Sequence, residues 1–246
     1  MTEFQNKVVF VTGAASGIGY AQANAFLKAG SLVFGVDIQH DFGNLSDHSH
    51  FKSFSGDVSQ AKICQEAVFA CRNCFGDVDI LLNTAGILDG YQTIEETDLD
   101  LWQKVLATNL TSMFVITKEV LPQMLKKASG TIINMASVAS FVGGGGGIAY
   151  TSAKHAVAGF TKQLALDYAG KGIHVNGLAP GAIQTPMNAA DFAGDGAMAK
   201  WVAEETPMKR WAQPEEVATV TLFLASEQAR YMQGTILPID GGWLLK

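Results

Sequence analysis

Short apolar, β-branched runs alternate with helical stretches along almost the whole chain. Crossovers between parallel strands need about a dozen residues or more, and most of the intervening stretches supply them. This alternation is typical of right-handed βαβ units, which build a parallel sheet with helices on both faces. The sequence therefore predicts an α/β fold with a doubly wound parallel sheet. Seven strands are expected, at residues 7–11, 32–37, 51–55, 80–83, 131–136, 174–178 and 235–239.

Capping residues and breakers mark the expected helices between these strands. Gly30 stands where a helix-ending glycine is expected, whereas the segment 38–50 has poor periodicity and predicts a short turn or no helix. His40, His48 and His50 are interpreted as exposed loop residues there. The helices are expected from a glycine turn to Ala29, from a cap at Ser59 toward Phe75, from Asp98 toward Pro122, over 150–169, and from Pro214.

Composition narrows the functional classes. The chain has 246 residues, 48% hydrophobic and 16% charged, which fits a single globular domain spanning 1–246. A net charge of -6 gives no electrostatic reason to bind nucleic acid or an anionic membrane. We expect no transmembrane segment, and no signal peptide in the N-terminal residues 1–7, so a cytoplasmic protein is the default.

Three cysteines raise the question of a metal site. Cys71 and Cys74 have CxxC spacing, and Cys64 lies seven residues before Cys71. The same spacing places all three on one helix face with apolar neighbours, and a closed zinc site needs a fourth ligand. We therefore expect buried core cysteines and no metal.

The turn between the first strand and its helix is rich in glycine. Gly13, Gly17 and Gly19 allow the backbone to approach a pyrophosphate, and the helix N-terminus offers N–H donors and partial positive charge. Asp37 ends the second strand, where a carboxylate accepts the adenosine ribose hydroxyls and repels a 2′-phosphate. No Lys or Arg stands at Ser16 or in 38–50, so we expect NAD(H) in preference to NADP(H). The alternative for Asp37 alone is an ordinary turn residue.

A Tyr-x-x-x-Lys spacing points to proton transfer. Tyr150 and Lys154 lie one helical turn apart, so the ammonium is expected to lower the pKa of the phenol. Ser137 follows the fifth strand and is a hydroxyl donor able to polarise a substrate carbonyl. Each of these signals is weak when taken alone.

Taken together and in order, the motifs resemble those of a short-chain dehydrogenase/reductase over essentially the whole chain. The resemblance implies a Rossmann-type catalytic domain. The motifs that carry it are the Thr12–Gly19 turn, Asp57-Val58, Asn83-Thr84-Ala85-Gly86, Asn109, Ser137, Tyr150 with Lys154, Pro180-Gly181 with Ile183 and Thr185, and Asp240-Gly241-Gly242.

The resemblance also implies roles for individual residues. Tyr150 is the general acid/base, and Lys154 tunes it and binds the nicotinamide ribose. Ser137 orients the substrate oxygen, and Asn109 holds a proton-relay water. The expected cofactor contacts are Gly13, Ser16, Gly17, Ile18, Gly19, Asp37, Asp57, Val58, Asn83, Ala85, Gly86, Tyr150, Lys154, Pro180, Gly181, Ile183 and Thr185. Thr84 departs from the family pattern, which more often has a second Asn there.

Two segments are expected to shape the substrate side. The run 143–147 is five glycines, which either leaves room for a substrate against the main chain or forms a flexible loop. The stretch 188–206 is the specificity lid in this family, and its alternative is a plain pair of surface helices.

The sequence predicts an oxidoreductase that transfers a hydride between a nicotinamide cofactor and a secondary alcohol or ketone of the small alcohol, polyol or sugar type. A 3-oxoacyl-[acyl-carrier-protein] reductase is the alternative, with Lys126, Lys127 and Lys171 as candidate contacts for an acidic acyl carrier protein beside the cleft. A non-catalytic dinucleotide sensor is a more remote alternative. The family resemblance also implies a homotetramer, in which the helices around 99–121 and 150–169 pair with their symmetry mates.

Overall fold

The computed structural model describes residues 3–246, so Met1 and Thr2, which begin the N-terminal segment discussed above, lie outside the described range. Seven strands form one parallel sheet in the order β3-β2-β1-β4-β5-β6-β7, which confirms the expected fold class. The order reverses direction between β1 and β4, as in doubly wound folds. The strands are β1 Val8–Thr12, β2 Leu32–Asp37, β3 Phe51–Ser55, β4 Ile80–Asn83, β5 Gly130–Met135, β6 Ile173–Pro180 and β7 Ile236–Ile239.

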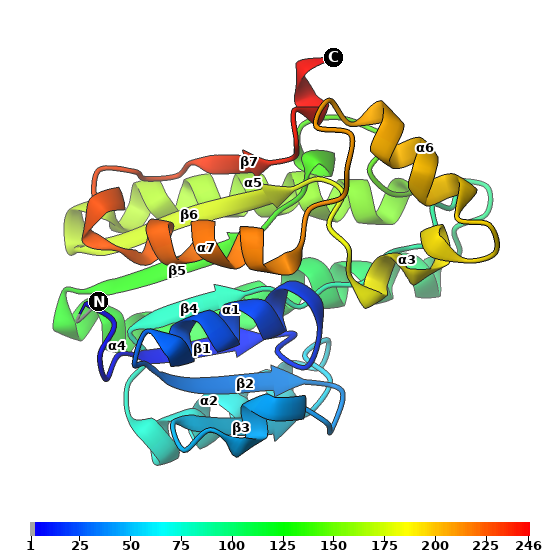
Figure 1. Ribbon diagram of the computed structural model, residues 1–246. Coiled ribbons are helices and arrows are strands. Elements are labelled where there is room, and N and C mark those ends of the chain that lie inside the picture. The colour runs from blue at the N-terminus through cyan, green and yellow to red at the C-terminus, as the bar shows by residue number, and fades with distance from the viewer. Residues whose placement is uncertain (1–2) are drawn as a thin grey trace.

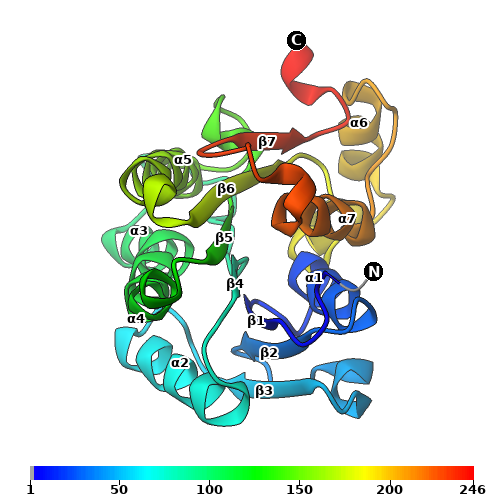
Figure 2. The same ribbon diagram turned by 90° about the vertical axis from the view of Figure 1, so that its left-hand side faces the viewer.

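Helices cover both faces of the sheet. Figure 2 shows α2, α4 and α5 on one face and α1 with α7 on the other. In Figure 1 the strands point toward the side of the molecule where α6 lies. The helices are α1 Gly17–Lys28, α2 Ala61–Phe75, α3 Leu99–Leu106, α4 Ser112–Lys127, α5 Ile148–Tyr168, α6 Ala197–Glu205 and α7 Pro214–Ala225.

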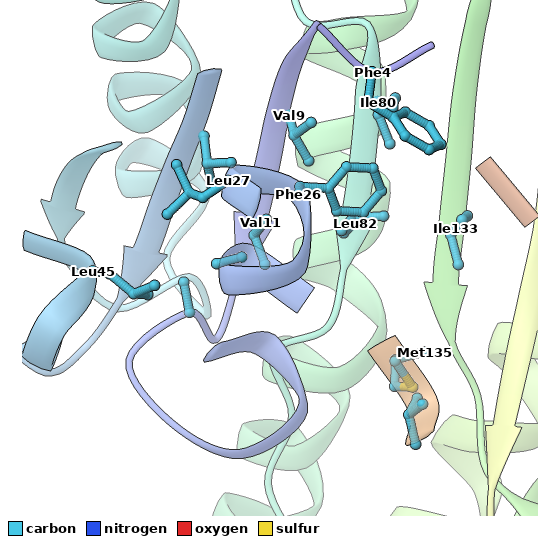
Figure 3. Close-up of a cluster of buried hydrophobic side chains, with 14 of the residues drawn as sticks. Phe4, Val9, Val11, Phe26, Leu27, Leu45, Ile80, Leu82, Ile133 and Met135 are labelled. Atoms are coloured by element: carbon cyan, nitrogen blue, oxygen red, sulfur yellow. The ribbon is translucent and has the colours of Figure 1, made fainter. Parts of the chain in front are cut away.

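Alternating side chains of the central strands divide the core between the two faces. Val9 and Val11 of β1 pack with Phe26 of α1 on one face (Figure 3), whereas Val8 and Phe10 pack with residues of α2 and α4 on the other. Every residue of β1 is buried, as expected for a strand covered on both sides. Burying each large apolar side chain contributes about 1.5–3 kcal/mol, and this holds the carboxyl ends of the strands in fixed positions.

Local structure departs from the expectations at a few positions. The helix expected to be capped by Ser59 begins at Ala61, because Asp57 accepts the Ser59 N–H in a turn and delays the helix. Asp98 does cap α3, accepting the Leu101 N–H at 2.7 Å. The helix that follows continues past Pro122 to Lys127. Segment 38–50 holds only a 3-10 turn, Gly43–Asp47, as expected.

The cysteine prediction was wrong for one residue. Cys64 and Cys71 are fully buried under the sheet, but Cys74 is exposed. Seven residues return the helix to the same face after two turns, whereas a further three residues rotate Cys74 toward its edge. Within residues 3–246, His, Cys, Asp and Glu form no group of three or more that is placed to hold a metal ion. No helix in that range is both long and apolar enough to cross a membrane.

Candidate active site

A cavity of about 1060 Å3 opens at the carboxyl ends of the strands. It lies where the strand order reverses between β1 and β4, which is the position at which open α/β sheets bind their ligands. The cavity brings together most of the residues predicted from the sequence. They are Gly13, Ser16, Gly17, Ile18, Gly19, Asp37, Asp57, Val58, Ala85, Gly86, Ser137, Tyr150, Lys154, Pro180, Gly181, Ile183 and Thr185.

The glycine turn leaves its backbone open to the cavity. Gly13 adopts φ +70°, and a Cβ at Gly19 would lie 2.0 Å from the Gly13 carbonyl oxygen, so both positions require glycine. Ser16 is the N-cap residue of α1, and its side chain makes no capping hydrogen bond. The N-terminal amides of α1 therefore carry no side-chain partner from their own cap and are available to an anion.

Asp37 connects the second strand to the glycine turn. Its carboxylate accepts hydrogen bonds from the Ala15 N–H and the Gln39 N–H, both at 3.0 Å, and the residue is buried. Asp37 therefore makes the hydrogen bonds of a turn residue, and it also lines the cavity. The next residue, Ile38, is 65% exposed and lines the cavity as well, so an apolar side chain follows Asp37 there.

Ser137 stands at the start of a 3-10 turn, Val138–Ser140, that follows β5. Its hydroxyl accepts the Ala139 N–H at 3.2 Å, and Ser137 lines the cavity together with Tyr150. Ser140 fastens this turn to α5 by donating to the Lys154 carbonyl oxygen at 2.6 Å. The sequence analysis missed Ser140, although its place three residues after Ser137 is the spacing of a capping box.

Burial dominates the electrostatics of Tyr150 and Lys154. It raises the pKa of the Tyr150 phenol to about 12, and the hydrogen bond from Ser137 offsets only part of this rise. Burial also lowers the pKa of the Lys154 ammonium to about 8. The phenol pKa was expected to fall, so its direction differs from that expectation. The Lys154 ammonium does not offset this rise in the phenol pKa. Its Nζ lies 5.5 Å from the Tyr150 ring centroid and donates to the Met135 carbonyl oxygen at 2.7 Å.

Asn109 lies beside this group but does not line the cavity. It falls in a π-helical turn, Ala107–Thr111, between α3 and α4, and π turns are frequent at functional sites. Its carboxamide accepts the Ile87 N–H at 2.8 Å and donates to the Ile87 carbonyl at 2.9 Å. Asn109 Oδ1 and Lys154 Nζ both lie beside Gly86. A Cβ added to Gly86 would be 3.3 Å from Asn109 Oδ1 and 3.7 Å from Lys154 Nζ.

The side chain of Asn83, an expected cofactor contact, does not face the cavity. Its side chain turns into the protein, donating to Asn134 Oδ1 at 2.9 Å and to Thr117 Oγ1 at 3.4 Å, and it does not line the cavity. Successive side chains of a strand point to opposite faces, and Asn83 as the last residue of β4 points toward α4. Thr84 lines the cavity instead, and its hydroxyl donates to Gln22 at 2.6 Å.

The segment 188–206, expected to be a lid or a pair of surface helices, lies along one side of the cavity. It begins within a 3-10 segment, Pro186–Phe192, and includes α6, so it is largely helical. Phe192 packs on Trp211 with ring centroids 4.9 Å apart, and the Trp211 indole donates to the Ala199 carbonyl at 2.9 Å. This segment contributes cavity-lining residues Asn188, Asp191, Met198, Trp201 and Val202, and Pro186 and Met187 directly before it line the cavity too.

The lysines predicted to face an acyl carrier protein lie far from the cavity. Lys127 ends α4 and pairs with Asp77 and Asp79, which precede β4. Lys126 is its neighbour, and Lys171 directly precedes β6. In a parallel sheet these positions are at the amino ends of the strands, whereas the cavity is at the carboxyl ends. The prediction that these lysines lie beside the cleft was therefore wrong.

The sequence analysis also missed Asp89 and Tyr91, in the loop that follows β4. Asp89 is a buried carboxylate that contacts the first turn of α5. Tyr91 lines the cavity, adopts φ +59°, and has its pKa raised mainly by burial and further by Asp191 and Asp89. No local pattern marks either residue, because their partners lie far away in the sequence.

A doubly wound sheet with a glycine turn and a buried Ser–Tyr–Lys group in one cavity defines a nicotinamide-dependent oxidoreductase. The chain belongs to the short-chain dehydrogenase/reductase family. A family model described as "Enoyl-(Acyl carrier protein) reductase" matches residues 13–244.

Three relatives illustrate the range of this family. The short-chain dehydrogenase/reductase cdmF of Talaromyces verruculosus is 36% identical, with 97% of each chain covered. The 2-dehydro-3-deoxy-D-gluconate 5-dehydrogenase of Bacillus subtilis (strain 168) is also 36% identical, over 98% of this chain and 95% of that protein. The crystal structure of a putative NAD(P)-dependent gluconate 5-dehydrogenase from Beutenbergia cavernae, with NADP bound at low occupancy, has a TM-score of 0.90 and 35% identity, covering 99% of this chain and all of that one.

Proposed function

We propose that this protein, as one catalytic domain spanning 1–246, uses NAD(H) to interconvert a secondary alcohol and a ketone of the small alcohol, polyol or sugar type. The observation that carries the proposal is the convergence of Ser137, Tyr150 and Lys154 in the cavity that also holds the glycine turn and Asp37. A proton donor beside a nucleotide cradle is what hydride transfer to a carbonyl requires.

The cavity residues fit a dinucleotide. The amides of the glycine turn and the N-terminus of α1 would hold the pyrophosphate, and Asp37 the adenosine ribose. Asp57 and Val58 would meet the adenine, whereas Ile183 and Thr185 would meet the nicotinamide end. The nicotinamide, when bound, supplies or accepts the hydride. Asp37 and Ile38 support NAD(H) over NADP(H), although the Beutenbergia relative carries NADP.

The protein side chains handle the proton. With a pKa of about 12, the Tyr150 phenol is protonated at neutral pH and ready to donate its proton to the oxygen of a ketone. Ser137, which lines the cavity beside the phenol, would orient the same substrate oxygen. Lys154 places its Nζ beside Gly86 and Asn109, where it would bind the nicotinamide ribose.

The substrate end of the cavity supports a hydroxylated substrate with apolar parts. Tyr91 and Asp191 offer hydrogen-bonding groups, while Met187, Met198 and Trp201 offer apolar surface. The two relatives with printed sugar-acid activities, from Bacillus and Beutenbergia, are consistent with this class. The second candidate is a 3-oxoacyl-[acyl-carrier-protein] reductase; the family model is described as a different reductase of acyl-carrier-protein substrates, one that acts on enoyl groups. The distance of Lys126, Lys127 and Lys171 from the cavity weighs against it.

A panel of ketones, sugar lactones, keto-sugars and 3-oxoacyl thioesters, assayed with NADH and with NADPH, tests the proposal. We expect turnover of a small ketone or keto-sugar with NADH. Turnover confined to 3-oxoacyl thioesters would select the second candidate. Tight NADH binding with no turnover across the panel, and none of the alcohols in reverse, would revive the sensor interpretation.

We further propose a cytoplasmic homotetramer. Phe114 on α4 and Leu166 on α5 are 50% and 77% exposed, so each helix of the proposed interface presents a large apolar side chain at its surface. On α5, Ala153 and Ala158 are buried inside the subunit, while the small residue Gly159 is exposed and would allow a second helix to approach closely. Three free cysteines suit a reducing compartment. A monomer mass by light scattering at micromolar concentration would contradict the tetramer.

A further inference from the structure

The first turn of α5 has no capping side chain of its own. Its N-cap residue is Gly147, and Tyr150 is the third residue of the helix, so the N–H groups of both need partners from elsewhere. The Ile148 N–H donates to the Gln92 carbonyl at 3.1 Å. The loop after β4 therefore already contributes one backbone acceptor to this helix end.

Asp89 of the same loop supplies side-chain acceptors for two further N–H groups of this helix end. Its Oδ1 accepts the Gly147 N–H at 2.8 Å and the Tyr91 N–H at 3.2 Å, and its Oδ2 accepts the Tyr150 N–H at 2.8 Å. The carboxylate is only 2% exposed, so these bonds replace its water. A negative charge at a helix N-terminus is also favoured by the helix dipole. The cap comes from a residue 61 positions before Tyr150.

The glycines before α5 make room for this arrangement. A Cβ at Gly147 would lie 2.6 Å from both the N and the O of Gln92, so no capping side chain fits there. A Cβ at Gly146 would lie 2.4 Å from Cδ1 of the Tyr150 ring. Gly143 is different, because nothing lies within 4 Å of its added Cβ and its φ is not in the left-handed region. The C-terminal end of the glycine run, at Gly146 and Gly147, therefore has no room for a side chain, whereas Gly143 at its N-terminal end does.

We propose that Asp89 is a positioning residue for Tyr150: its buried carboxylate replaces the missing cap of α5 and, with Gly146 and Gly147, fixes where the phenol stands in the cavity. The role of the phenol itself rests on the proposed function. Asp89 touches neither the proposed substrate position nor the glycine turn, and it acts only through the backbone of α5 and the loop.

Asp89 has a second effect through its charge. The groups that face Tyr150 are Asp89 and Tyr91 from the loop after β4 and Ser137 from the turn after β5, with Lys154 one turn along its own helix. The negative charge of Asp89 adds to the rise in the phenol pKa that burial causes. Removing the charge should therefore lower the phenol pKa, while removing the hydrogen bonds should move the ring.

Asp89→Ala and Asp89→Asn separate these effects. Asp89→Ala removes both, and we expect kcat for the substrate found in the panel to fall by about 10- to 100-fold, because small displacements of a reacting group are costly. Asp89→Asn keeps an acceptor for one N–H group, so its kcat should lie between those of the wild type and Asp89→Ala. Both variants should shift the alkaline limb of the kcat/KM profile to lower pH, with the dissociation constant for NADH changed less than threefold.

Asp98→Asn is the matched control. Asp98 caps α3 from an exposed position, so this variant also weakens a helix cap but stands away from Tyr150. We expect it to lower Tm slightly and to leave kcat and the pH profile unchanged. The proposal is overturned if Asp89→Ala keeps kcat within twofold of the wild type, or if Asp98→Asn reproduces both the kcat loss and the pH shift.

A readout without turnover keeps this test apart from the proposed function. The ultraviolet titration of tyrosinate in the wild type, minus that of Tyr150→Phe, isolates the Tyr150 phenol, and its midpoint should be lower in Asp89→Asn. If Tyr150→Phe retains turnover, the proposed function fails, while an unchanged titration midpoint in Asp89→Asn overturns the present inference. For the glycines, Gly146→Ala should lower kcat at least tenfold and Gly143→Ala should not, and equal effects would contradict the assigned contact.

Discussion

Two helices begin in the same cavity after glycine-rich turns, yet their N-termini are used in opposite ways. At α1 the cap residue Ser16 makes no side-chain hydrogen bond, and the open backbone suits a phosphate. At α5 a buried carboxylate, Asp89, already accepts the N–H groups of Gly147 and Tyr150. One helix end is thus left free for a ligand, and the other is fixed by the protein to hold a reacting side chain. Glycine content alone does not distinguish these roles.

The substitution Tyr150→Phe should have the largest effect, and it should act at the α5 helix end but not at the α1 helix end. Removing the hydroxyl should lower kcat by about 10²–10⁴, because general acid–base catalysis contributes this much, while NADH affinity should barely change. Stopped-flow turnover and fluorescence titration of NADH give the two numbers. A variant that keeps near-normal turnover would remove Tyr150 from the chemistry, whatever the family membership.

The α1 end of the comparison was predictable from the sequence, and the α5 end was predictable only in part. Gly13, Gly19 and Asp37 are adjacent in the chain to the strands that position them, so the strand-turn-helix pattern places them directly. Tyr150 and Lys154 were placed by helical spacing. Asp89 was not, because its contact with α5 spans about 60 residues and depends on how the loop after β4 folds back.

Other features that the sequence does not place have the same physical origin. The side chain of Asn83 turns away from the cavity, because the direction of a side chain at the end of a strand depends on which partners the sheet offers, here Asn134 and Thr117. The sequence gives no sign of the π turn that carries Asn109. The pKa of Tyr150 was expected from a neighbouring charge, whereas burial, which only the three-dimensional structure shows, dominates it.

The next largest effect is expected for Lys154, where the pH dependence of stability tests the burial of its ammonium group. The folded-state pKa of about 8 lies below the ordinary 10.5, so the stability that this group contributes is full above pH 10.5 and is lost as the pH falls through 8. The shift corresponds to about 3 kcal/mol. Lys154→Met should therefore gain stability relative to the wild type on going from pH 10.5 to pH 7, as measured by urea unfolding. A difference that is independent of pH would mean that the ammonium is well solvated.

A smaller effect is expected on cofactor preference, at the α1 helix end, and two variants test it. Hydrogen bonds to charged groups contribute about 1.5–3 kcal/mol, so we expect kcat/KM to favour NADH over NADPH by about ten- to a hundredfold. Ile38→Arg adds a cation and leaves the hydrogen bonds from Ala15 and Gln39 to Asp37 in place, so NADPH use should rise by about tenfold with little loss for NADH. Asp37→Ala should lower use of both cofactors, because it also loosens the glycine turn. A wild type that prefers NADPH would contradict the assignment.

The smallest effect concerns the lid. Trp201 on α6 lines the cavity and is 53% exposed, so truncating it removes only part of the apolar surface offered to a substrate. Losing about 1.4 kcal/mol of substrate contact corresponds to a tenfold rise in KM. Trp201→Ala should show this rise with kcat and NADH affinity unchanged, because Tyr150 and the glycine turn belong to other elements. Phe69→Ala, at an aromatic side chain on α2 that is 65% exposed and outside the cavity, is the matched control. A fall in kcat without a rise in KM would show that α6 affects the chemical step by closing the cavity. In that case α6, like the Asp89 cap of α5, would serve to position the reacting groups.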